Sequence, residues 1–274
     1  MTQQLTLEQY RRLRDFIYQK TGIYFTDSKL YFVERRLLDR MESAGISEFS
    51  DYYTLLRFET SGLELQAFIE ALTVNETYFF REFNQLKCFA EEILPEITRN
   101  NPQRLLFWSA GCSTGEEAYT LAIILSEMLS PEMLGRCKIL ATDIDNKVLS
   151  FARRGIYGER SIKHVPKPYL QRYFDQVGNE YRVDSSLRQL IDFKALNLVD
   201  SKSMRQVPET SVIFCRNVLI YFDDISRRQV ALDFYETLQE GGYIFLGHSE
   251  SMSRITSMFQ LRKMQNAIAY QKAK

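Results

Sequence analysis

The apolar positions of residues 1–72 recur with helical spacing. The first predicted helix starts after Thr6 and stops at Gly22, and its apolar face consists of Tyr10, Leu13, Phe16 and Ile17. Three more helices are predicted at about Asp27–Glu42, from Ser50-Asp51 onward, and at Leu63–Leu72. Because no segment here alternates with a period of two, residues 1–72 are predicted to form an all-α domain.

From about Arg104 the pattern changes to short apolar runs separated by amphipathic helices. The predicted elements are, in order, strand 105–108, helix 116–129, strand 138–142, helix 146–154, strand 212–215, helix 225–239 and strand 243–246. This alternation is typical of a mostly parallel sheet with helices on both faces. We therefore expect an α/β, Rossmann-like catalytic domain at 101–274, joined to the helical domain by a linker and active-site segment at 73–100.

Two stretches depart from this alternation. Glu180–Val183 and Leu190–Lys194 resemble strands on either side of Asp184-Ser-Ser, which predicts a small antiparallel β-subdomain at about 168–196. Residues from Phe259 to the region of Tyr270 are predicted to form a hairpin that returns into the main sheet.

Composition narrows the class of protein. Among 274 residues, 35 Lys and Arg balance 35 Asp and Glu, so the chain lacks the basic excess of a nucleic-acid-binding protein. The longest clean apolar run, Leu121–Leu125, is too short to insert in a membrane, and the first residues do not resemble an export signal. Four scattered cysteines and two histidines provide no familiar zinc-site spacing. We expect a cytoplasmic, reduced protein without a metal, and expect it to be a monomer.

The segment Trp108-Ser-Ala-Gly111-Cys-Ser-Thr-Gly115-Glu-Glu117 leads from a predicted strand through two glycines into a helix. Parallel sheets bind ligands at the carboxyl ends of their strands, and glycine lets the backbone approach a ligand closely. The third glycine of the dinucleotide fingerprint is absent, so an adenosine ligand without phosphates fits better than a pyrophosphate. The alternative is an ordinary strand–helix turn.

Glu117 has two interpretations. Thr114 followed three residues later by Glu117 matches a capping box, which is a structural device, and the spacing alone favours this role. The functional alternative places the Glu117 carboxylate against the ammonium group of an amino-acid-like ligand.

Asp143, at the end of the second predicted strand, is the candidate acceptor for ribose hydroxyls, whereas Asp145 is expected to cap the next helix. Asn197-Leu198 and the segment Phe214–Phe222 also follow strands. Residues 73–82 combine polar side chains with three consecutive aromatic residues. They are interpreted either as part of the site or as a helix start capped by Thr77, with the aromatics forming an interdomain core.

Five ordered segments together resemble the CheR-type chemotaxis receptor methyltransferases. They are Thr73-Val-Asn-Glu-Thr-Tyr-Phe-Phe-Arg-Glu82, Trp108–Glu117, Ala141-Thr-Asp-Ile-Asp145, Cys215-Arg-Asn-Val-Leu-Ile-Tyr-Phe222 and Gly247-His-Ser-Glu250. The resemblance covers nearly the whole chain. It implies an S-adenosylmethionine-dependent fold, and methyl esterification of glutamates on the cytoplasmic helices of chemoreceptors, with S-adenosylhomocysteine as product.

The resemblance also implies roles for individual residues. Those facing the cofactor would be Asn75, Thr77, Arg81, Gly111, Glu117 at the methionine moiety, Asp143 at the ribose, Asn197, Leu198, Asn217 and Val218. Arg81 and Tyr221 would flank the methyl group as catalytic residues. The β-subdomain docks a receptor's C-terminal pentapeptide in some members, and the residues here do not distinguish the two types.

The acidic receptor helices suggest a basic docking surface on the second predicted helix. Its candidates are Lys29, Arg35, Arg36 and Arg40, and the alternative is an ordinary solvated face. Two other functions compete with receptor methylation. A methyltransferase that acts on RNA is disfavoured, because this chain has balanced charge and no basic stripe. A methyltransferase that acts on a small molecule is disfavoured, because it would not need a dedicated helical domain. A catalytically silent adaptor is disfavoured by the presence of Arg81, Asp143 and Asn217.

Overall fold

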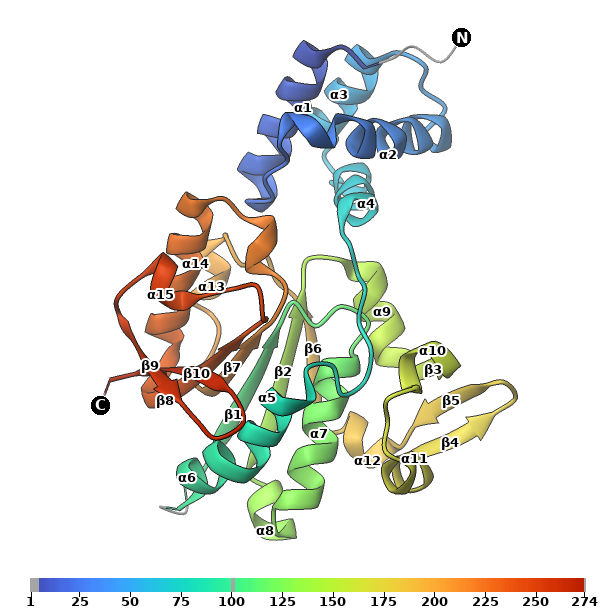
Figure 1. Ribbon diagram of the computed structural model, residues 1–274. Helices are drawn as coiled ribbons and strands as arrows, with labels where there is room; N and C mark the ends of the chain where they lie inside the picture. The colour runs from blue at the N-terminus through green and yellow to red at the C-terminus, as the bar shows by residue number, and fades with distance from the viewer. Residues whose placement is uncertain (1–4, 100–101, 274) are drawn as a thin grey trace. The chain divides into compact units, whose positions relative to one another are not determined.

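The computed structural model describes residues 5–99 and 102–273, which divide into two compact units (Figure 1). Of the described residues, unit 1 comprises 5–74 and 221–226, and unit 2 comprises 75–99, 102–220 and 227–273. Each unit has its own core of buried apolar side chains.

Unit 1 is helical, as predicted. Its elements are α1 (Leu7–Thr21), the 3₁₀ turn η1 (Asp27–Lys29), α2 (Leu30–Ser43), α3 (Phe49–Phe58) and α4 (Leu63–Leu72). The hydroxyl of Thr6 accepts a hydrogen bond from the N–H of Gln9, and Gly22 ends α1 in a left-handed conformation, so both predicted ends of this helix are confirmed. Segment 221–226 joins this unit through an antiparallel bridge between Ile23 and Phe222, and through a 2.9 Å hydrogen bond from the Tyr18 hydroxyl to Asp223.

Unit 2 begins with irregular chain at 75–82 and continues into consecutive helical turns before its sheet. These turns are α5 (Phe83–Cys88), the π-helical turn η2 (Phe89–Ile93) and α6 (Leu94–Thr98). The strands of the main sheet are β1 (Leu105–Ala110), β2 (Cys137–Asp143), β6 (Ile191–Ala195), β7 (Thr210–Cys215), β8 (Leu238–Leu246), β9 (Phe259–Lys263) and β10 (Ile268–Lys272). Their order is β6-β2-β1-β7-β8-β10-β9, and β10 is antiparallel to both of its neighbours. The predicted C-terminal hairpin is therefore confirmed.

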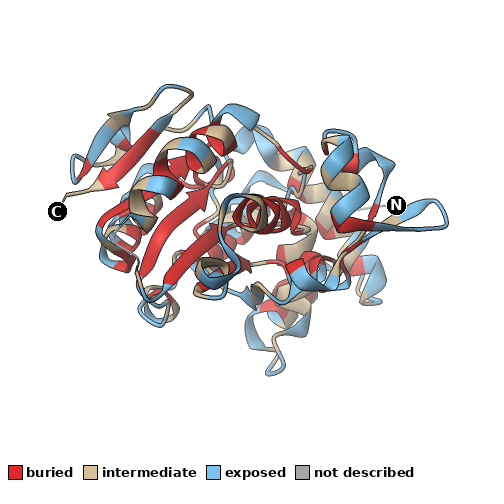
Figure 2. Ribbon diagram, turned by 90° about the horizontal axis from the view of Figure 1, so that it is seen from below, coloured by how far each residue is buried: buried red, intermediate tan, exposed pale blue. Residues whose placement is uncertain are grey.

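Helices connect the strands and cover the sheet. They are α7 (Glu116–Met128), α8 (Pro131–Leu134), α9 (Asn146–Arg154), α10 (Glu159–Ile162), α11 (Lys167–Tyr173), α12 (Ser185–Arg188), α13 (Ser201–Met204), the 3₁₀ turn η3 (Leu219–Tyr221), α14 (Asp224–Thr237) and α15 (Met252–Ile255). The two faces of β1 are both covered: Phe107 packs edge-on against Phe89, and Trp108 packs against Phe234 of α14. Burial on both faces explains why β1 and β7 read as continuous apolar runs (Figure 2).

The small antiparallel sheet differs from the prediction. It contains β3 (Ile156–Gly158), β4 (Phe174–Val177) and β5 (Glu180–Val183), in the order β3-β5-β4. The expected pairing across Asp184-Ser-Ser is wrong, because β6 pairs in parallel with β2 and forms the edge of the main sheet. The helix α12 lies between β5 and β6, so the chain leaves the small sheet before β6 joins the main sheet. In the sequence, two short strands separated by a polar turn look like a hairpin and do not show this crossover.

The sheet order reverses at β1. The chain moves outward from β1 to β2 and β6, and then returns to place β7 on the other side of β1. In open parallel sheets a ligand binds at the carboxyl ends of the strands where the order reverses. The loops after β1, β2, β6, β7 and β8 therefore form the expected site of unit 2.

Candidate active site

The turn after β1 requires glycine for two reasons. Gly111 and Gly115 have φ values of +83° and +95°, which side-chain-bearing residues rarely adopt. A Cβ atom on Gly111 would also lie 2.4 Å from Cγ2 of Val218, and one on Gly115 would lie 2.8 Å from Cβ of Ala152. The glycines thus allow close packing of the turn against the loop after β7 and against α9.

Three backbone N–H groups of this turn donate to the end of β2. Those of Gly111 and Cys112 both donate to the carbonyl of Thr142 at 2.8 Å, and that of Ser113 donates to the Asp143 carboxylate at 2.8 Å. Buried Glu116 and Glu117 occupy the first turn of α7. A phosphate would therefore meet two carboxylates and few free donors, which supports the prediction of a phosphate-free ligand.

Asp143 ends β2, as predicted. Its carboxylate accepts hydrogen bonds from the N–H groups of Ser113 and Asp145 at 2.8 and 3.0 Å, and only 9% of the residue is exposed. Burial raises the pKa of Asp143 to about 6, although the backbone hydrogen bonds oppose this shift. Asp145 caps α9 through hydrogen bonds from the N–H groups of Lys147 and Val148, so that prediction is confirmed.

The capping-box interpretation of Glu117 is wrong. Gly115, in the left-handed conformation, is the N-cap residue of α7, so Glu117 occupies the second helical position instead of the third. The Thr114 hydroxyl donates to the Glu116 carboxylate at 2.6 Å. The Glu117 carboxylate instead accepts hydrogen bonds from the Ser109 hydroxyl and from Nε of Arg216, both at 2.6 Å.

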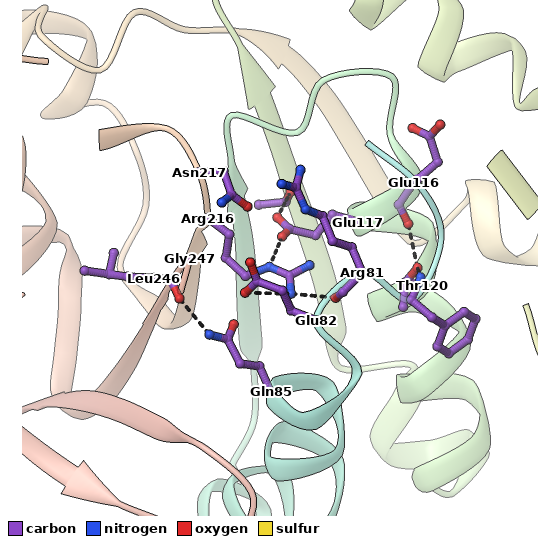
Figure 3. Close-up of polar contacts among 12 residues, drawn as sticks. Arg81, Glu82, Gln85, Glu116, Glu117, Thr120, Arg216, Asn217, Leu246 and Gly247 are labelled. Carbon is purple, nitrogen blue, oxygen red and sulfur yellow. Dashed lines mark hydrogen bonds and ion pairs between the residues drawn. The ribbon is translucent and has the colours of Figure 1, made fainter. Parts of the chain in front are cut away.

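Arg216 is a central residue that the sequence reasoning did not select. Its side chain is 3% exposed and lies between the carboxylates of Glu117 and Glu82 (Figure 3). One terminal nitrogen donates to the carbonyl of Arg81 at 2.8 Å and lies 3.8 Å from Glu82. The sequence did offer one signal for Arg216, namely a basic residue directly after the apolar strand β7. A charge buried at a strand end needs partners of opposite sign, so this position predicts a buried ion pair.

Residues 75–82 form an irregular, strained segment instead of a helix start. The interpretation of Thr77 as a helix cap is wrong, because α5 begins at Phe83 and Thr77 lies in irregular chain. Phe80 and Glu82, on either side of Arg81, have φ values of 60° and 57°. Such backbone in residues other than glycine costs about 1–3 kcal/mol each, and it persists only where the surroundings enforce it.

Hydrogen bonds to neighbouring elements enforce that backbone. The N–H of Phe79 donates to the carbonyl of Ser161 at 3.1 Å, the N–H of Phe80 donates to the Thr120 hydroxyl at 3.2 Å, and Arg216 bonds the carbonyl of Arg81. Phe79 and Phe80 are buried in the core of unit 2, which corrects the expected interdomain role for these rings. The Arg81 guanidinium donates to the carbonyl of Glu76 at 2.9 Å and lies 5.9 Å from the centre of the Tyr78 ring.

The remaining predicted cofactor residues lie on loops of unit 2. Asn75 donates to the Asp145 carboxylate at 2.9 Å. Asn197 and Leu198 follow β6, where the N–H of Leu196 bonds the carbonyl of Asp143 at 3.0 Å.

The loop after β7 carries the other predicted residues. Asn217 adopts a left-handed conformation (φ 61°), and its buried Oδ1 has no partner among the described residues. Val218 covers Gly111. Tyr221 belongs to unit 1, where its carbonyl accepts a hydrogen bond from the N–H of Tyr24.

No helix in the described ranges is long and apolar enough to cross a membrane. Across residues 5–99 and 102–273, His, Cys, Asp and Glu side chains do not gather in groups of three or more that could hold a metal ion.

The sheet order reverses at β1, and the glycine turn after β1 lies at this point together with the buried carboxylates of Glu117 and Asp143. This arrangement is typical of α/β domains that bind a nucleoside at the strand ends, a class that includes the S-adenosylmethionine-dependent methyltransferases. Comparison with known proteins identifies the family. Residues 75–268 match the CheR methyltransferase, SAM binding domain, and residues 8–73 match the CheR methyltransferase, all-alpha domain. The chain therefore belongs to the CheR methyltransferase family, and the resemblance inferred from its motifs is confirmed.

Individual relatives match over nearly their full lengths. Chemotaxis protein methyltransferase 2 of Vibrio cholerae is 46% identical over 98% of this chain and 94% of its own. Chemotaxis protein methyltransferase of Escherichia coli is 38% identical over 96% of this chain and 91% of its own, and that of Borreliella burgdorferi is 35% identical over 90% and 89%.

Proposed function

We propose that this protein transfers the methyl group of S-adenosylmethionine to glutamate carboxylates of chemoreceptors, forming methyl esters that serve adaptation in bacterial chemotaxis. The observation that carries the proposal is the link made by Arg216. This one buried side chain bonds Glu117 in the pocket and the backbone of Arg81 in the strained segment. Glu117, which is proposed to bind the cofactor, and Arg81, which is suited to hold an anionic substrate, are thereby connected in one network.

The pocket residues fit S-adenosylmethionine. Asp143 would accept hydrogen bonds from the ribose hydroxyls, and Glu117 would face the ammonium group of the methionine moiety. One oxygen of Glu117 accepts a hydrogen bond from Ser109 and the other from Arg216, so lone pairs remain on both for a further donor. The buried Oδ1 of Asn217 has no partner within the described part of the chain and needs a donor as well. Asn75, Thr77, Gly111, Asn197, Leu198 and Val218 would line the rest of the pocket.

The substrate needs no general base. A glutamate carboxylate has an ordinary pKa of about 4.3, so it is already an anionic nucleophile at neutral pH. When bound, S-adenosylmethionine supplies a methyl group on a positively charged sulfur. The task of the protein is to align the two groups and to exclude water, and alignment alone contributes on the order of 7–11 kcal/mol in favourable cases.

Arg81 is suited to orient the incoming carboxylate, because its planar guanidinium binds a carboxylate with two parallel hydrogen bonds. The backbone conformation of Phe80 and Glu82 is fixed by their surroundings, so the position from which the Arg81 side chain extends is fixed before the substrate binds. Its hold on the carboxylate must weaken toward the transition state, since the anion becomes a neutral ester and tight ground-state binding would slow the reaction. Tyr221 is proposed to help hold the carboxylate.

Arg81→Ala tests this assignment. We expect kcat to fall by about 100- to 1000-fold in a methyl-transfer assay, with Arg81→Lys intermediate, because the positive charge remains but the planar fork is lost. Lys87→Ala, which removes a half-exposed cation of α5, should leave kcat unchanged. A near-normal rate for Arg81→Ala would remove this residue from the active site.

The proposed receptor-docking surface on α2 is smaller than the sequence suggested. Arg40 does not contribute a free charge, because it forms two hydrogen bonds with Glu64, at 2.6 and 3.0 Å. Lys29 and Arg35 are exposed, and Arg36 lies half-buried with its guanidinium 3.5 Å from the centre of the Phe32 ring. We therefore restrict the basic docking surface to Arg35 and Arg36 of α2 and to Lys29, the last residue of η1, directly before α2.

Charge reversal tests this surface. Arg35→Glu with Arg36→Glu should weaken methylation of receptor fragments and leave the affinity for S-adenosylhomocysteine unchanged. Arg57→Glu reverses an exposed charge on α3 of the same unit and serves as the control. An equal loss in both proteins would contradict a specific docking role for α2.

We further propose that the protein is a cytoplasmic monomer. Its proposed domains are 1–72 and 101–274, joined by the active-site segment at 73–100.

A further inference from the structure

Glu250 connects two loops of the active-site edge. It lies in the segment Gly247-His-Ser-Glu250, directly after β8. One oxygen of its carboxylate accepts hydrogen bonds from the N–H groups of Gly247 at 2.7 Å and Asn217 at 2.8 Å. The other oxygen accepts the N–H of Ile220 at 3.2 Å. A single side chain therefore holds both ends of the loop Asn217–Ile220.

The two loops are also packed too closely to shift independently. A Cβ atom on Gly247 would lie 2.8 Å from the backbone nitrogen of Asn217 and 2.9 Å from the Glu250 carboxylate. Burial raises the pKa of Glu250, while the surrounding backbone N–H groups oppose the shift by favouring the charged form. A carboxylate placed in this way is a strong acceptor whose removal leaves several N–H groups without a partner.

The loop that Glu250 holds carries two residues of the proposed cofactor pocket. Asn217 is held in a left-handed conformation, and Val218 packs over Gly111 at the turn after β1. We infer that Glu250 is a positioning residue, which sets Asn217 and Val218 for cofactor binding without touching the cofactor itself. This inference rests on the proposed function, because it takes the pocket to bind S-adenosylmethionine.

Glu250→Ala and Glu250→Gln test the inference in the full chain. For Glu250→Ala we expect the affinity for S-adenosylhomocysteine, measured by isothermal titration, to fall about tenfold or more. The KM for S-adenosylmethionine should rise correspondingly, with little change in kcat, since Arg81 is untouched. Glu250→Gln should be intermediate: its carbonyl oxygen still accepts from Asn217 and Gly247, but its amide group faces the N–H of Ile220, which is also a donor.

Hydrogen exchange gives a readout that needs no ligand. The amides of 217–220 should exchange faster in Glu250→Ala than in the wild-type protein, while those of β1 and β7 remain protected.

Glu92 provides a matched control. Its carboxylate also ties a loop through backbone N–H groups, those of Gln265 and Asn266 between β9 and β10. Glu92→Ala should leave the affinity for S-adenosylhomocysteine and the exchange of 217–220 unchanged. Wild-type affinity in Glu250→Ala, or an equal loss in Glu92→Ala, would overturn the positioning role. Failure of the wild-type protein to bind S-adenosylhomocysteine would instead overturn the proposed function.

Discussion

Two backbone segments of unit 2 reach the proposed site by different means. The turn after β1 places glycine at φ values of +83° and +95°, whereas the segment before α5 places Phe80 and Glu82 at 60° and 57°. In the first, the conformation is intrinsic to the residue type and can be recognised in the sequence. In the second, a conformation that the residues themselves disfavour is imposed by buried rings and by hydrogen bonds. The N–H groups of Phe79 and Phe80 donate to Ser161 and Thr120, and Arg216 donates to the carbonyl of Arg81.

The two segments therefore differ in what fixes their backbone conformation. The two glycines of the turn after β1 adopt their positive φ values by local preference, and hydrogen bonds to Thr142 and Asp143 tie the turn to the end of β2. The segment that carries Arg81 depends on tertiary contacts, so its geometry should be the more sensitive to distant substitutions.

The largest effect is expected from removing Arg216. Arg216→Ala leaves Glu117 and Glu82 without their buried counter-charge, and we expect the free energy of unfolding to fall by about 3–5 kcal/mol. Chemical denaturation measures this change. Arg172→Ala is the control, because Arg172 pairs with Glu127 while 66% of its side chain is exposed, and its loss should cost no more than about 1 kcal/mol. Similar losses in the two variants would contradict a structural role for the buried network.

A smaller effect is expected from adding one methyl group to the turn after β1. Gly111→Ala should weaken binding of S-adenosylhomocysteine, because the new Cβ collides with Val218 in addition to adopting an unfavourable φ. Gly178→Ala has the same type of φ (+63°) and no atom within 4 Å of the added Cβ, so it should cost only about 1–2 kcal/mol of stability and no affinity. Val218→Ala in the Gly111→Ala background should recover part of the affinity. If it does not, the collision is not the cause.

The smallest effect is a pH dependence arising from Asp143. Its carboxyl has a pKa of about 6, so it is mostly ionised above pH 6 and increasingly protonated below. Because the ionised form is the better acceptor for ribose hydroxyls, affinity for S-adenosylhomocysteine should fall as the pH decreases from 8 to 5. Titrations across this range test the prediction, and Asp143→Asn should bind more weakly with a flatter profile. Constant wild-type affinity down to pH 5 would exclude Asp143 as this acceptor.

The raised pKa also has a consequence for stability. The folded protein retains the proton of Asp143 to a higher pH than the unfolded chain does, so ionisation of this group opposes folding. The contribution of Asp143 to the free energy of unfolding is therefore largest below the ordinary aspartate pKa of about 4 and is lost as the pH rises through about 6. Ligand affinity and this stability term should change in opposite directions with pH.

Sequence reasoning found most elements because their signals are local. The helices of unit 1, α7, α9 and the strands β1, β2, β7 and β8 follow from periodicity and capping, and Asp143 and Asp145 follow from their places at the end of β2 and the start of α9. The partner of β6 was missed because strand pairing depends on the path of the chain through α12, which leaves no local pattern.

The polar network of the site was harder to predict. The spacing of Thr114 and Glu117 favours a capping box, because spacing alone does not show that Gly115 shifts the helix start by one position, and only the family resemblance points to a cofactor role for Glu117. Arg216, Glu82 and Glu250 act through partners distant in sequence, on other loops, so residue type gave no indication of which charges would meet. The family resemblance supplied Asn217 and Val218, and the structure supplied the residues that hold them.

The most direct test of the account follows a labelled methyl group. Purified protein would be incubated with receptor cytoplasmic fragments and S-adenosylmethionine labelled in the methyl group. We predict that label enters the receptor, that mild alkali releases it as expected for a glutamate methyl ester, and that Arg81→Ala reduces its incorporation severely. Absence of transfer by a protein that binds S-adenosylhomocysteine, or label that resists alkali, would contradict the account.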